Sequence, residues 1–211
     1  MAVAREPFIT ISGIIGCGKT TLTEQLAKVM GLPSCYEPVL DNDVLVDFYK
    51  DMKANSFRLQ ISLLMKRFKL HQNIVWSGRG GVSDRSIYED IVFARVLTGT
   101  GGMTPGEYTE YRNAFDIMEN FMRHPDVILH LDVSPESAMS RIMARGREME
   151  KSITIGYLTS LKDEYEKFIV EVSAKIPVLR VNWEEFHDAR ELVPHINKLL
   201  KNRQNITYAT F

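Results

Sequence analysis

One short segment near the start of the chain has the residue types and spacing that bind phosphate groups. Residues 13–20 read Gly-Ile-Ile-Gly-Cys-Gly-Lys-Thr and match G-x-x-x-x-G-K-[ST], between a predicted strand and a predicted helix. Glycines let the backbone curl so that several N–H groups point at one anion, and the start of the helix adds its positive dipole end. The Lys19 ammonium suits the β- and γ-phosphates, and the Thr20 hydroxyl can ligate Mg²⁺. This P-loop predicts that the chain binds a nucleoside triphosphate.

A second phosphate-related signal is a run of arginines late in the chain. Arg141 and Arg145 are four residues apart, on one face near the end of a predicted helix, and Arg147 follows Gly146. Guanidinium groups that close over a transferring phosphoryl group stabilise its developing charge. The alternative is a solvated basic helix end favoured by the helix dipole. Beside a P-loop we favour the first interpretation. The residues expected to bind the triphosphate are then Gly13, Ile14, Ile15, Gly16, Cys17, Gly18, Lys19, Thr20, Thr21, Arg145 and Arg147.

Short apolar runs alternate with longer amphipathic stretches along the whole chain. The predicted strands are residues 8–12, 34–37, 80–84, 127–132 and 178–181. The predicted helices are residues 20–30, 43–52, 57–74, 87–97, 105–122, 136–145, 155–174 and 189–201. Strands separated by helices predict an α/β protein, with a parallel sheet of about five strands flanked by helices on both faces.

Composition limits the classes of protein that fit. The chain has 211 residues, 45% of them hydrophobic, and nothing in it resembles a linker, so we expect one domain over residues 1–211. The formal net charge of −1 argues against a general nucleic-acid binder. No apolar run approaches the roughly 18 residues of a membrane span, and the first residues do not resemble a secretory leader. With only Cys17 and Cys35 as cysteines, we expect a cytoplasmic protein without a disulfide framework.

Several further blocks resemble one family. Tyr36-Glu37-Pro38-Val39, Asp84-Arg85-Ser86-Ile87-Tyr88-Glu89-Asp90 and Leu131-Asp132-Val133-Ser134 follow the P-loop in the order and spacing of the deoxynucleoside kinases. The resemblance runs from Ile9 to the last predicted helix. It is greatest to the bacterial-type deoxyadenosine/deoxyguanosine kinases, with Asp84 before Arg-Ser and Asn42 soon after Glu-Pro-Val. It implies a P-loop kinase fold with an arginine-rich lid at about residues 141–152.

The resemblance implies transfer of the ATP γ-phosphate to the 5′-hydroxyl of a deoxyribonucleoside, as in nucleotide salvage. Purine deoxynucleosides are the preferred acceptors, with deoxycytidine as a further one. Glu37 matches the base that accepts the 5′-hydroxyl proton, and Arg85 matches the arginine that holds this carboxylate. Lys19, Arg141 and Arg145 complete the expected catalytic set. Asp84 would hold Mg²⁺ together with Thr20, since this ion takes few carboxylates and keeps several waters; Asp132 is the competing candidate.

Substrate contacts also follow from the resemblance. Tyr49 and Glu150 match residues that bind the sugar 3′-hydroxyl, with Glu148 as the alternative to Glu150. The base would be read by Gln60, Arg67 and Asp90. A carboxamide offers one donor side and one acceptor side to a base edge. Gln60 and Arg67 are seven residues apart on one helix face, and Asp90 would hold Arg67 by an ion pair. A salt bridge that only joins two helices is the alternative for that pair.

Two other functions are weighed against this one. A nucleoside monophosphate kinase of the thymidylate kinase type also has a P-loop and lid arginines, but Val39 and the Arg67/Asp90 pair count against it. A non-catalytic nucleotide-binding accessory subunit is opposed by the presence of Lys19, Glu37 and Arg85. The family resemblance further implies a homodimer formed through residues 87–97 and 105–122. It also implies a loop over the donor base at residues 181–186, where Trp183 or Phe186 would help.

Overall fold

The fold is a single parallel sheet covered by helices. The computed structural model describes residues 5–36 and 43–201 of the chain. Its five strands lie in the order β2-β3-β1-β4-β5, and every pairing is parallel. The strands are β1 (Phe8–Ser12), β2 (Ser34–Cys35), β3 (Gly81–Asp84), β4 (Val127–Asp132) and β5 (Val178–Asn182). The predicted α/β class and strand number are confirmed.

Strand β1 occupies the centre of the sheet, and every residue in it is buried. It pairs with β3 on one side, where Ile11 lies opposite Asp84, and with β4 on the other, where Ile11 lies opposite Leu129. The chain order therefore reverses on the two sides of β1. In open α/β sheets, the crevice at the carboxyl ends of such strands is where ligands bind.

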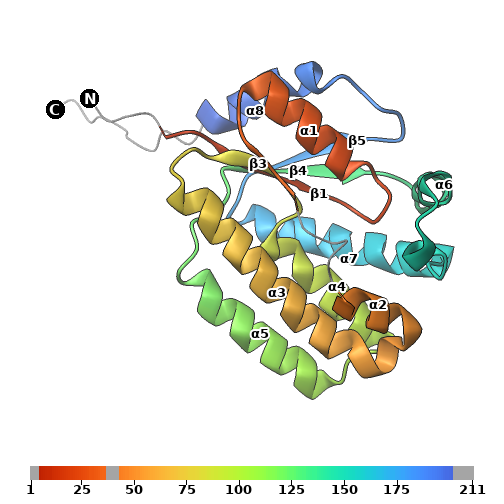
Figure 1. Cartoon of the computed structure of the whole chain (residues 1–211). Coiled ribbons are helices and arrows are strands. Elements are labelled where there is room, and N and C mark those ends of the chain that lie inside the picture. The colour runs from red at the N-terminus through yellow and green to blue at the C-terminus, as the bar shows by residue number, and fades with distance from the viewer. Residues whose placement is uncertain (1–4, 37–42, 202–211) are drawn as a thin grey trace.

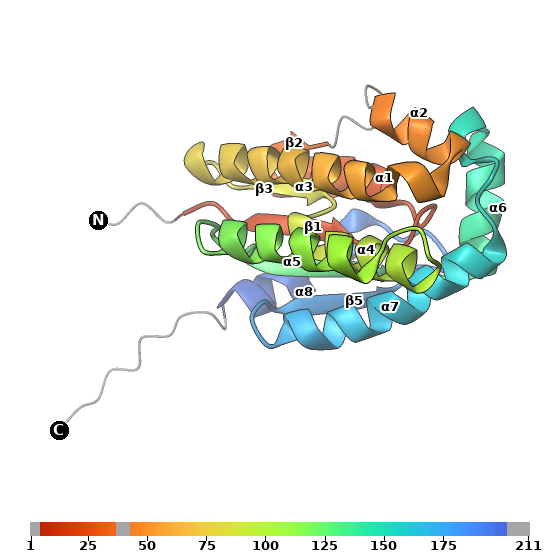
Figure 2. The same ribbon diagram turned by 90° about the horizontal axis from the view of Figure 1, so that it is seen from below.

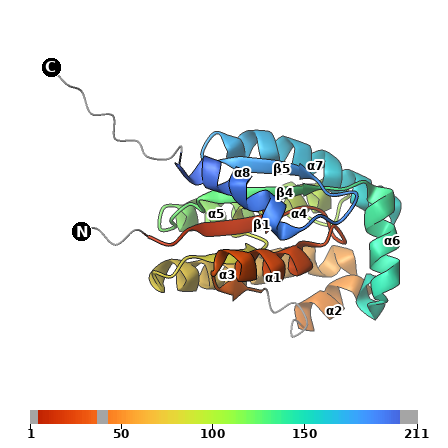
Figure 3. The ribbon, with the colours of Figure 1, turned by 90° about the horizontal axis from the view of Figure 1, so that it is seen from above.

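Helices cover both faces of the sheet (Figures 1 and 3). Helices α1 (Lys19–Met30) and α8 (Ala189–Lys201) lie on one face, and α3 (Met52–Trp76), α4 (Asp90–Gly99) and α7 (Ile155–Ser173) lie on the other. Helix α5 (Pro105–Glu119) packs outside α3 and α4. This double cover explains why every residue of β1, and every residue of β4 except Asp132, is buried.

The remaining elements stand at the carboxyl ends of the strands. Helix α6 (Pro135–Arg145) crosses this end of the sheet, and α2 (Asp43–Lys50) lies at the same end (Figure 2). Two short 3₁₀ turns, η1 (Ile87–Glu89) and η2 (Glu148–Glu150), follow β3 and α6. The predicted lid thus contains the end of α6 and all of η2.

Several element boundaries differ from the sequence expectation by a few residues. Helix α3 begins five residues before the predicted start at residue 57, because the Asp51 side chain accepts a hydrogen bond from Ala54 N at 3.1 Å and caps the helix there. The predicted helix over residues 87–97 is divided into η1 and α4, and β2 ends at Cys35 within the described part. Within residues 5–36 and 43–201, no helix combines the length and apolar character needed to cross a bilayer.

Candidate active site

The P-loop joins β1 to α1, and its glycines fit tightly against the neighbouring backbone. A Cβ atom on Gly13 would lie 2.9 Å from Leu131 O, and one on Gly16 would lie 2.5 Å from Ala138 O. Both glycines also have positive φ angles, 147° and 84°. The strand–loop–helix context predicted from the sequence is therefore present, and only glycine fits at these two positions.

The two functional side chains of the P-loop have different partners. Lys19 Nζ donates hydrogen bonds to Gly13 O at 2.9 Å and Ile14 O at 2.8 Å. Burial, and then the positive charge of Arg85, lower the pKa of Lys19 from its ordinary value. The exposed Thr20 hydroxyl instead donates to Asp84 Oδ2 at 2.5 Å. The lysine is thus held against the loop, and the threonine faces the end of β3.

Thr20 and Asp84 fit the needs of Mg²⁺. Both offer oxygen atoms, the ligand type this ion prefers, and both line the same cleft. Among the described residues, no cluster of three or more His, Cys, Asp or Glu side chains could hold a metal ion. A magnesium ion here would complete its shell with water and substrate phosphates, which is its usual mode of binding.

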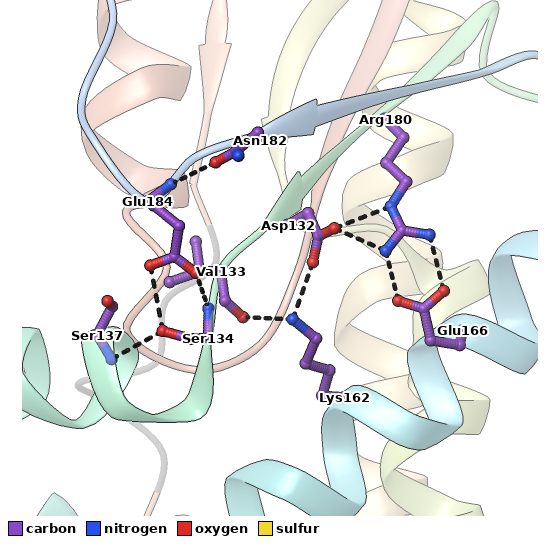
Figure 4. A network of polar contacts seen from close by, with 9 residues as sticks. All are labelled: Asp132, Val133, Ser134, Ser137, Lys162, Glu166, Arg180, Asn182 and Glu184. Carbon is purple, nitrogen blue, oxygen red and sulfur yellow. Dashed lines mark hydrogen bonds and ion pairs between the residues drawn. The ribbon is translucent and has the colours of Figure 1, made fainter.

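The competing magnesium candidate, Asp132, is occupied by basic side chains (Figure 4). Its Oδ2 accepts hydrogen bonds from Arg180 at 3.0 and 2.6 Å, and its Oδ1 lies 3.1 Å from Lys162 Nζ. Partial burial alone would raise the pKa of Asp132, but the hydrogen bonds from Arg180 and Lys162 hold it below its ordinary value. Arg180 also pairs with Glu166. Asp132 therefore ties β4 to β5 and α7, and Asp84 remains the better ligand.

A cleft of about 540 Å³ opens beside the P-loop at the carboxyl ends of the strands. This volume suits a small organic molecule. The cleft brings together side chains from the P-loop, α3, β3 and the lid. The predicted site residues that line it are Ile15, Gly16, Gly18, Lys19, Thr20, Thr21, Gln60, Arg67, Asp84, Arg85, Arg145, Arg147 and Glu150.

One end of the cleft carries the residues predicted to read a base. Gln60 is 2% exposed, and its Oε1 has no hydrogen-bond partner among the described residues. Arg67 forms an ion pair with Asp90, whose side chain is fully buried. A buried carboxamide oxygen without a partner costs free energy, which a ligand that donates a hydrogen bond would recover. This end of the cleft is therefore suited to a polar, planar ligand edge.

Arg85 is held on several sides. Its Nη1 donates to Glu89 Oε1 at 3.1 Å and to the Tyr165 hydroxyl oxygen at 3.2 Å, and its guanidinium lies 5.0 Å from the centre of the Phe93 ring. Its φ angle of 72° makes it the single non-glycine residue with positive φ in the described part. Such strained conformations cluster at functional sites.

Glu89 and Tyr165 were not predicted as site residues. Glu89 lies inside the block Asp84 to Asp90, but nothing in its spacing distinguishes it from a surface acid. Tyr165 lies 76 residues further along the chain, in the middle of α7. A signal that could have found Tyr165 is its helical spacing with Leu158, Leu161 and Phe168, which puts its hydroxyl on the buried face of α7, where it needs a partner.

Two arginines of the lid form ion pairs with an acidic side chain in the cleft. Arg145 Nη2 donates to both carboxylate oxygens of Glu150, at 2.7 and 2.6 Å, and Arg147 Nη1 lies 3.5 Å from the same side chain. Glu148 instead extends into solvent, with its side chain 83% exposed, and pairs with Lys151. Of the two acids considered for the sugar, Glu150 is therefore the one at the cleft.

Arg141 lies away from the cleft lining. Its guanidinium donates to Cys17 O at 3.0 Å, Trp183 O at 2.9 Å and Glu184 O at 2.8 Å, and lies 4.3 Å from the Phe186 ring centre. The reason is that α6 crosses the end of the sheet, so that only its last turn reaches the cleft. Arg141 thus joins the P-loop to the segment after β5, where Trp183 is buried.

The side chains of two predicted site residues lie outside the part of the chain that the structure describes. Glu37 lies outside the described residues, as do Pro38 and Asn42. The backbone of Tyr49 belongs to α2, but its side chain is outside the described part. The roles expected for Glu37 and Tyr49 stay predictions.

A P-loop at the centre of a five-stranded parallel sheet, with an aspartate on the next strand and arginines on a helix across its end, defines a P-loop kinase fold. The family model of the deoxynucleoside kinases matches residues 9–203. The chain therefore belongs to the deoxynucleoside kinase family. The resemblance seen in the sequence is confirmed, and so is the expected enzyme class, a phosphotransferase.

Individual relatives cover most of the chain. It is 50% identical to a deoxyadenosine kinase of Dictyostelium discoideum, over 89% of this chain and 77% of the relative. It is 38% identical to a deoxyadenosine/deoxycytidine kinase of Bacillus subtilis, over 87% and 86% of the two chains. A solved deoxyadenosine kinase from M. mycoides with bound dATP superimposes with a TM-score of 0.80 at 27% identity, over 91% of this chain and 100% of that one.

Proposed function

We propose that this enzyme transfers the γ-phosphate of ATP to the 5′-hydroxyl of a purine deoxyribonucleoside, deoxyadenosine before deoxyguanosine, with deoxycytidine as a further acceptor and Mg²⁺ as the cofactor. One observation carries the proposal: the buried, unpartnered Oε1 of Gln60 lines the same cleft as Lys19 and Thr20 of the P-loop. Such a reaction needs one group that binds the base of the acceptor and one loop that binds the triphosphate of the donor. This cleft has both.

The base end supports acceptors whose base carries an amino group beside a ring nitrogen. Adenine and cytosine each present an amino donor beside a ring-nitrogen acceptor, which a carboxamide such as Gln60 pairs with on both its sides. Arg67, fixed by the fully buried Asp90, adds a donor at this end. A thymine methyl group against this buried guanidinium would desolvate the charge without giving it a hydrogen bond. The 50% identity to a deoxyadenosine kinase supports deoxyadenosine as the first acceptor.

The residues of the chain then have distinct tasks. Glu37 accepts the proton of the 5′-hydroxyl while that oxygen forms a bond to the γ-phosphorus, and the bond from phosphorus to the β–γ bridging oxygen breaks to release ADP. Arg85 orients the attacking oxygen, and Lys19 and Arg145 stabilise charge on the phosphoryl oxygens. Tyr49 and Glu150 bind the 3′-hydroxyl. When bound by Thr20 and Asp84, Mg²⁺ would neutralise charge on the β- and γ-phosphates.

Arg141 has a supporting task in this scheme. Its hydrogen bonds to Cys17 O, Trp183 O and Glu184 O hold the P-loop against the segment that would cover the donor base. We therefore assign Arg141 to organisation of the donor site rather than to contact with the transferred phosphoryl group. Phe186, 61% exposed and in contact with Arg141, is available on the same side.

The test is a coupled assay of ADP release with the four deoxynucleosides and the four deoxynucleoside monophosphates. We expect kcat/KM to be highest for deoxyadenosine and lowest for thymidine. Faster turnover of a monophosphate than of any nucleoside would favour a thymidylate-kinase-like enzyme instead. Binding of ATP without turnover of any acceptor would favour an accessory subunit. Lys19→Met is the matched control, because it removes the P-loop charge and should abolish the signal.

We further propose a homodimer formed through α4 and α5. The exposed apolar side chains of Ile117 on α5 and Phe121 just beyond it support this, at 64% and 73% exposure. Sedimentation should give twice the mass of the chain, and Ile117→Lys combined with Phe121→Lys should give the monomer. The cytoplasmic location expected from the sequence stays a prediction.

A further inference from the structure

A buried glutamate behind the cleft joins two of its walls. Glu89 is fully buried at the end of η1, and both of its carboxylate oxygens are used. Oε1 accepts a hydrogen bond from Arg85 Nη1 at 3.1 Å. Oε2 accepts one from the Tyr165 hydroxyl at 2.9 Å and a longer one from Gly13 N at 3.4 Å. One carboxylate therefore contacts the arginine after β3, the first glycine of the P-loop and the centre of α7.

A buried carboxylate is energetically unfavourable compared with an apolar side chain of similar size. Removing a charge from water costs several kcal/mol unless partners compensate it, and apolar residues often replace buried ion pairs without loss of stability. The Glu89 side chain is 0% exposed, so its carboxylate has no contact with solvent. Its presence at this point is better explained by what it holds in place than by stability.

The donors around Glu89 are themselves fixed. Tyr165 is 1% exposed, and burial, followed by the charge of Glu89, raises the pKa of its hydroxyl well above the ordinary value. Its hydroxyl therefore stays protonated and donates to Glu89. Arg85, with φ at 72°, is held between Glu89 and the Phe93 ring. The direction of the Arg85 guanidinium thus depends on Glu89.

We propose that Glu89 is a positioning residue, which fixes the Arg85 guanidinium relative to the first glycine of the P-loop and is itself oriented by Tyr165. The arginine on the acceptor side and the loop on the donor side then keep a constant separation during phosphoryl transfer. The inference rests on the proposed function, because it assigns Arg85 to the acceptor oxygen. It adds to that function a residue that contacts neither substrate.

The first test is Glu89→Gln, which keeps the shape and replaces one acceptor oxygen by a donor. A carboxamide cannot accept on both sides, so Arg85 or the Tyr165–Gly13 side must lose its partner. We expect kcat to fall by about 10- to 100-fold, since small misplacements of reacting groups cost this much. The KM values for deoxyadenosine and ATP should change by less than about 3-fold, because the base and triphosphate contacts stay. The matched control is Glu171→Gln, which removes the charge pair between Arg95 on α4 and the exposed Glu171 on α7 and should leave kcat unchanged.

The second test separates positioning from folding. Arg85→Lys keeps the charge but not the guanidinium geometry, so Glu89→Gln added to it should cost less than about 3-fold further in kcat. Tyr165→Phe removes only one hydroxyl from the ring and should lower kcat by about 3- to 10-fold, with unchanged circular dichroism; the loss should be smaller than for Glu89→Gln because the ion pair with Arg85 remains.

Three results would overturn the inference. The first is a wild-type kcat in folded Glu89→Gln. The second is a loss of kcat from Glu89→Gln that is equally large with and without the Arg85→Lys substitution. The third is a rise of the KM values for deoxyadenosine and ATP in Glu89→Gln while kcat stays constant. If Glu89→Gln does not fold, wild-type kcat in Tyr165→Phe overturns it instead. An inactive wild-type enzyme contradicts the proposed function, whereas an active one with unaffected variants contradicts only this inference.

Discussion

The Thr20 hydroxyl donates a 2.5 Å hydrogen bond to Asp84 Oδ2, and this contact joins the start of α1 to the end of β3. It is possible because β1 and β3 are neighbours, with Ile11 opposite Asp84. The same two oxygen atoms are those that we assign to Mg²⁺. The two candidate ligands of Mg²⁺ therefore lie next to each other and line the same cleft.

The first prediction concerns this pair. Asp84→Asn keeps the shape of the side chain but removes its charge, so we expect the apparent affinity for Mg²⁺ to fall by about 10- to 100-fold. The measurement is kcat/KM for ATP as a function of free Mg²⁺, with recovery at high concentration. Asp132→Asn is the matched control, because Asp132 is held by Arg180 and Lys162. An equal shift of the Mg²⁺ dependence in both variants would contradict the assignment.

The second prediction concerns the base. Glu37→Gln removes the proton acceptor without changing the size of the side chain, so kcat should fall by about 10²- to 10⁴-fold. The dissociation constant of deoxyadenosine, measured by calorimetry, should stay within about 3-fold of the wild-type value, since one hydrogen-bonding side chain replaces another of the same shape. Glu136→Gln, at an exposed position in the first turn of α6, serves as the control. Substantial turnover by Glu37→Gln would remove Glu37 from this role.

The third prediction follows from the backbone of Arg85. At a φ of 72°, any residue with a Cβ is strained, at a cost of about 1–2 kcal/mol. Both Arg85→Ala and Arg85→Gly lose the guanidinium and should be nearly inactive, but the glycine variant should have the higher free energy of unfolding, by about 1 kcal/mol. Urea unfolding of the two variants side by side measures the difference. An alanine variant as stable as the glycine variant would show that the left-handed conformation is not kept.

The fourth prediction concerns pH. Burial lowers the pKa of His71 and of His130 to about 4 in the folded protein, against about 6.5 in the unfolded chain. Between these values the unfolded state binds more protons, so the free energy of unfolding must fall as the pH falls from about 6.5 to about 4. His71→Gln removes one of the two groups, and its amide can still donate to Arg123 O, as His71 does at 2.7 Å.

The readout for His71→Gln is urea unfolding at about pH 8 and at about pH 5. The wild-type protein should lose about 2 kcal/mol more than the variant between these two conditions. The carboxylates contribute equally to the pH dependence of unfolding in both proteins, so the difference between the two proteins reports on His71. Parallel pH dependence in the two proteins would mean that His71 is protonated equally easily in both states.

The P-loop could be predicted from local spacing, because a single motif sets it. Asp84 and the Arg67–Asp90 pair were predicted from the resemblance to the deoxynucleoside kinases. The contact of Glu89 with Tyr165 was not, because it joins residues 76 positions apart and requires the packing of α7 against η1. The place of Arg141 was not foreseen either, because four-residue spacing fixes a helix face but not the direction of α6. The early start of α3 depended on one side-chain cap at Asp51.

The parallel arrangement of the five strands also has a practical use. In the described part of the chain, the P-loop, Asp84, Arg85 and Arg145 lie at the carboxyl ends of the strands, whereas the turn at Lys175 precedes β5 and lies at the opposite rim of the sheet. A fluorophore or a surface tether attached at this turn leaves the cleft beside the P-loop accessible to substrates. Immobilised or labelled protein of this design is therefore suited to single-molecule and flow-based assays of nucleoside turnover.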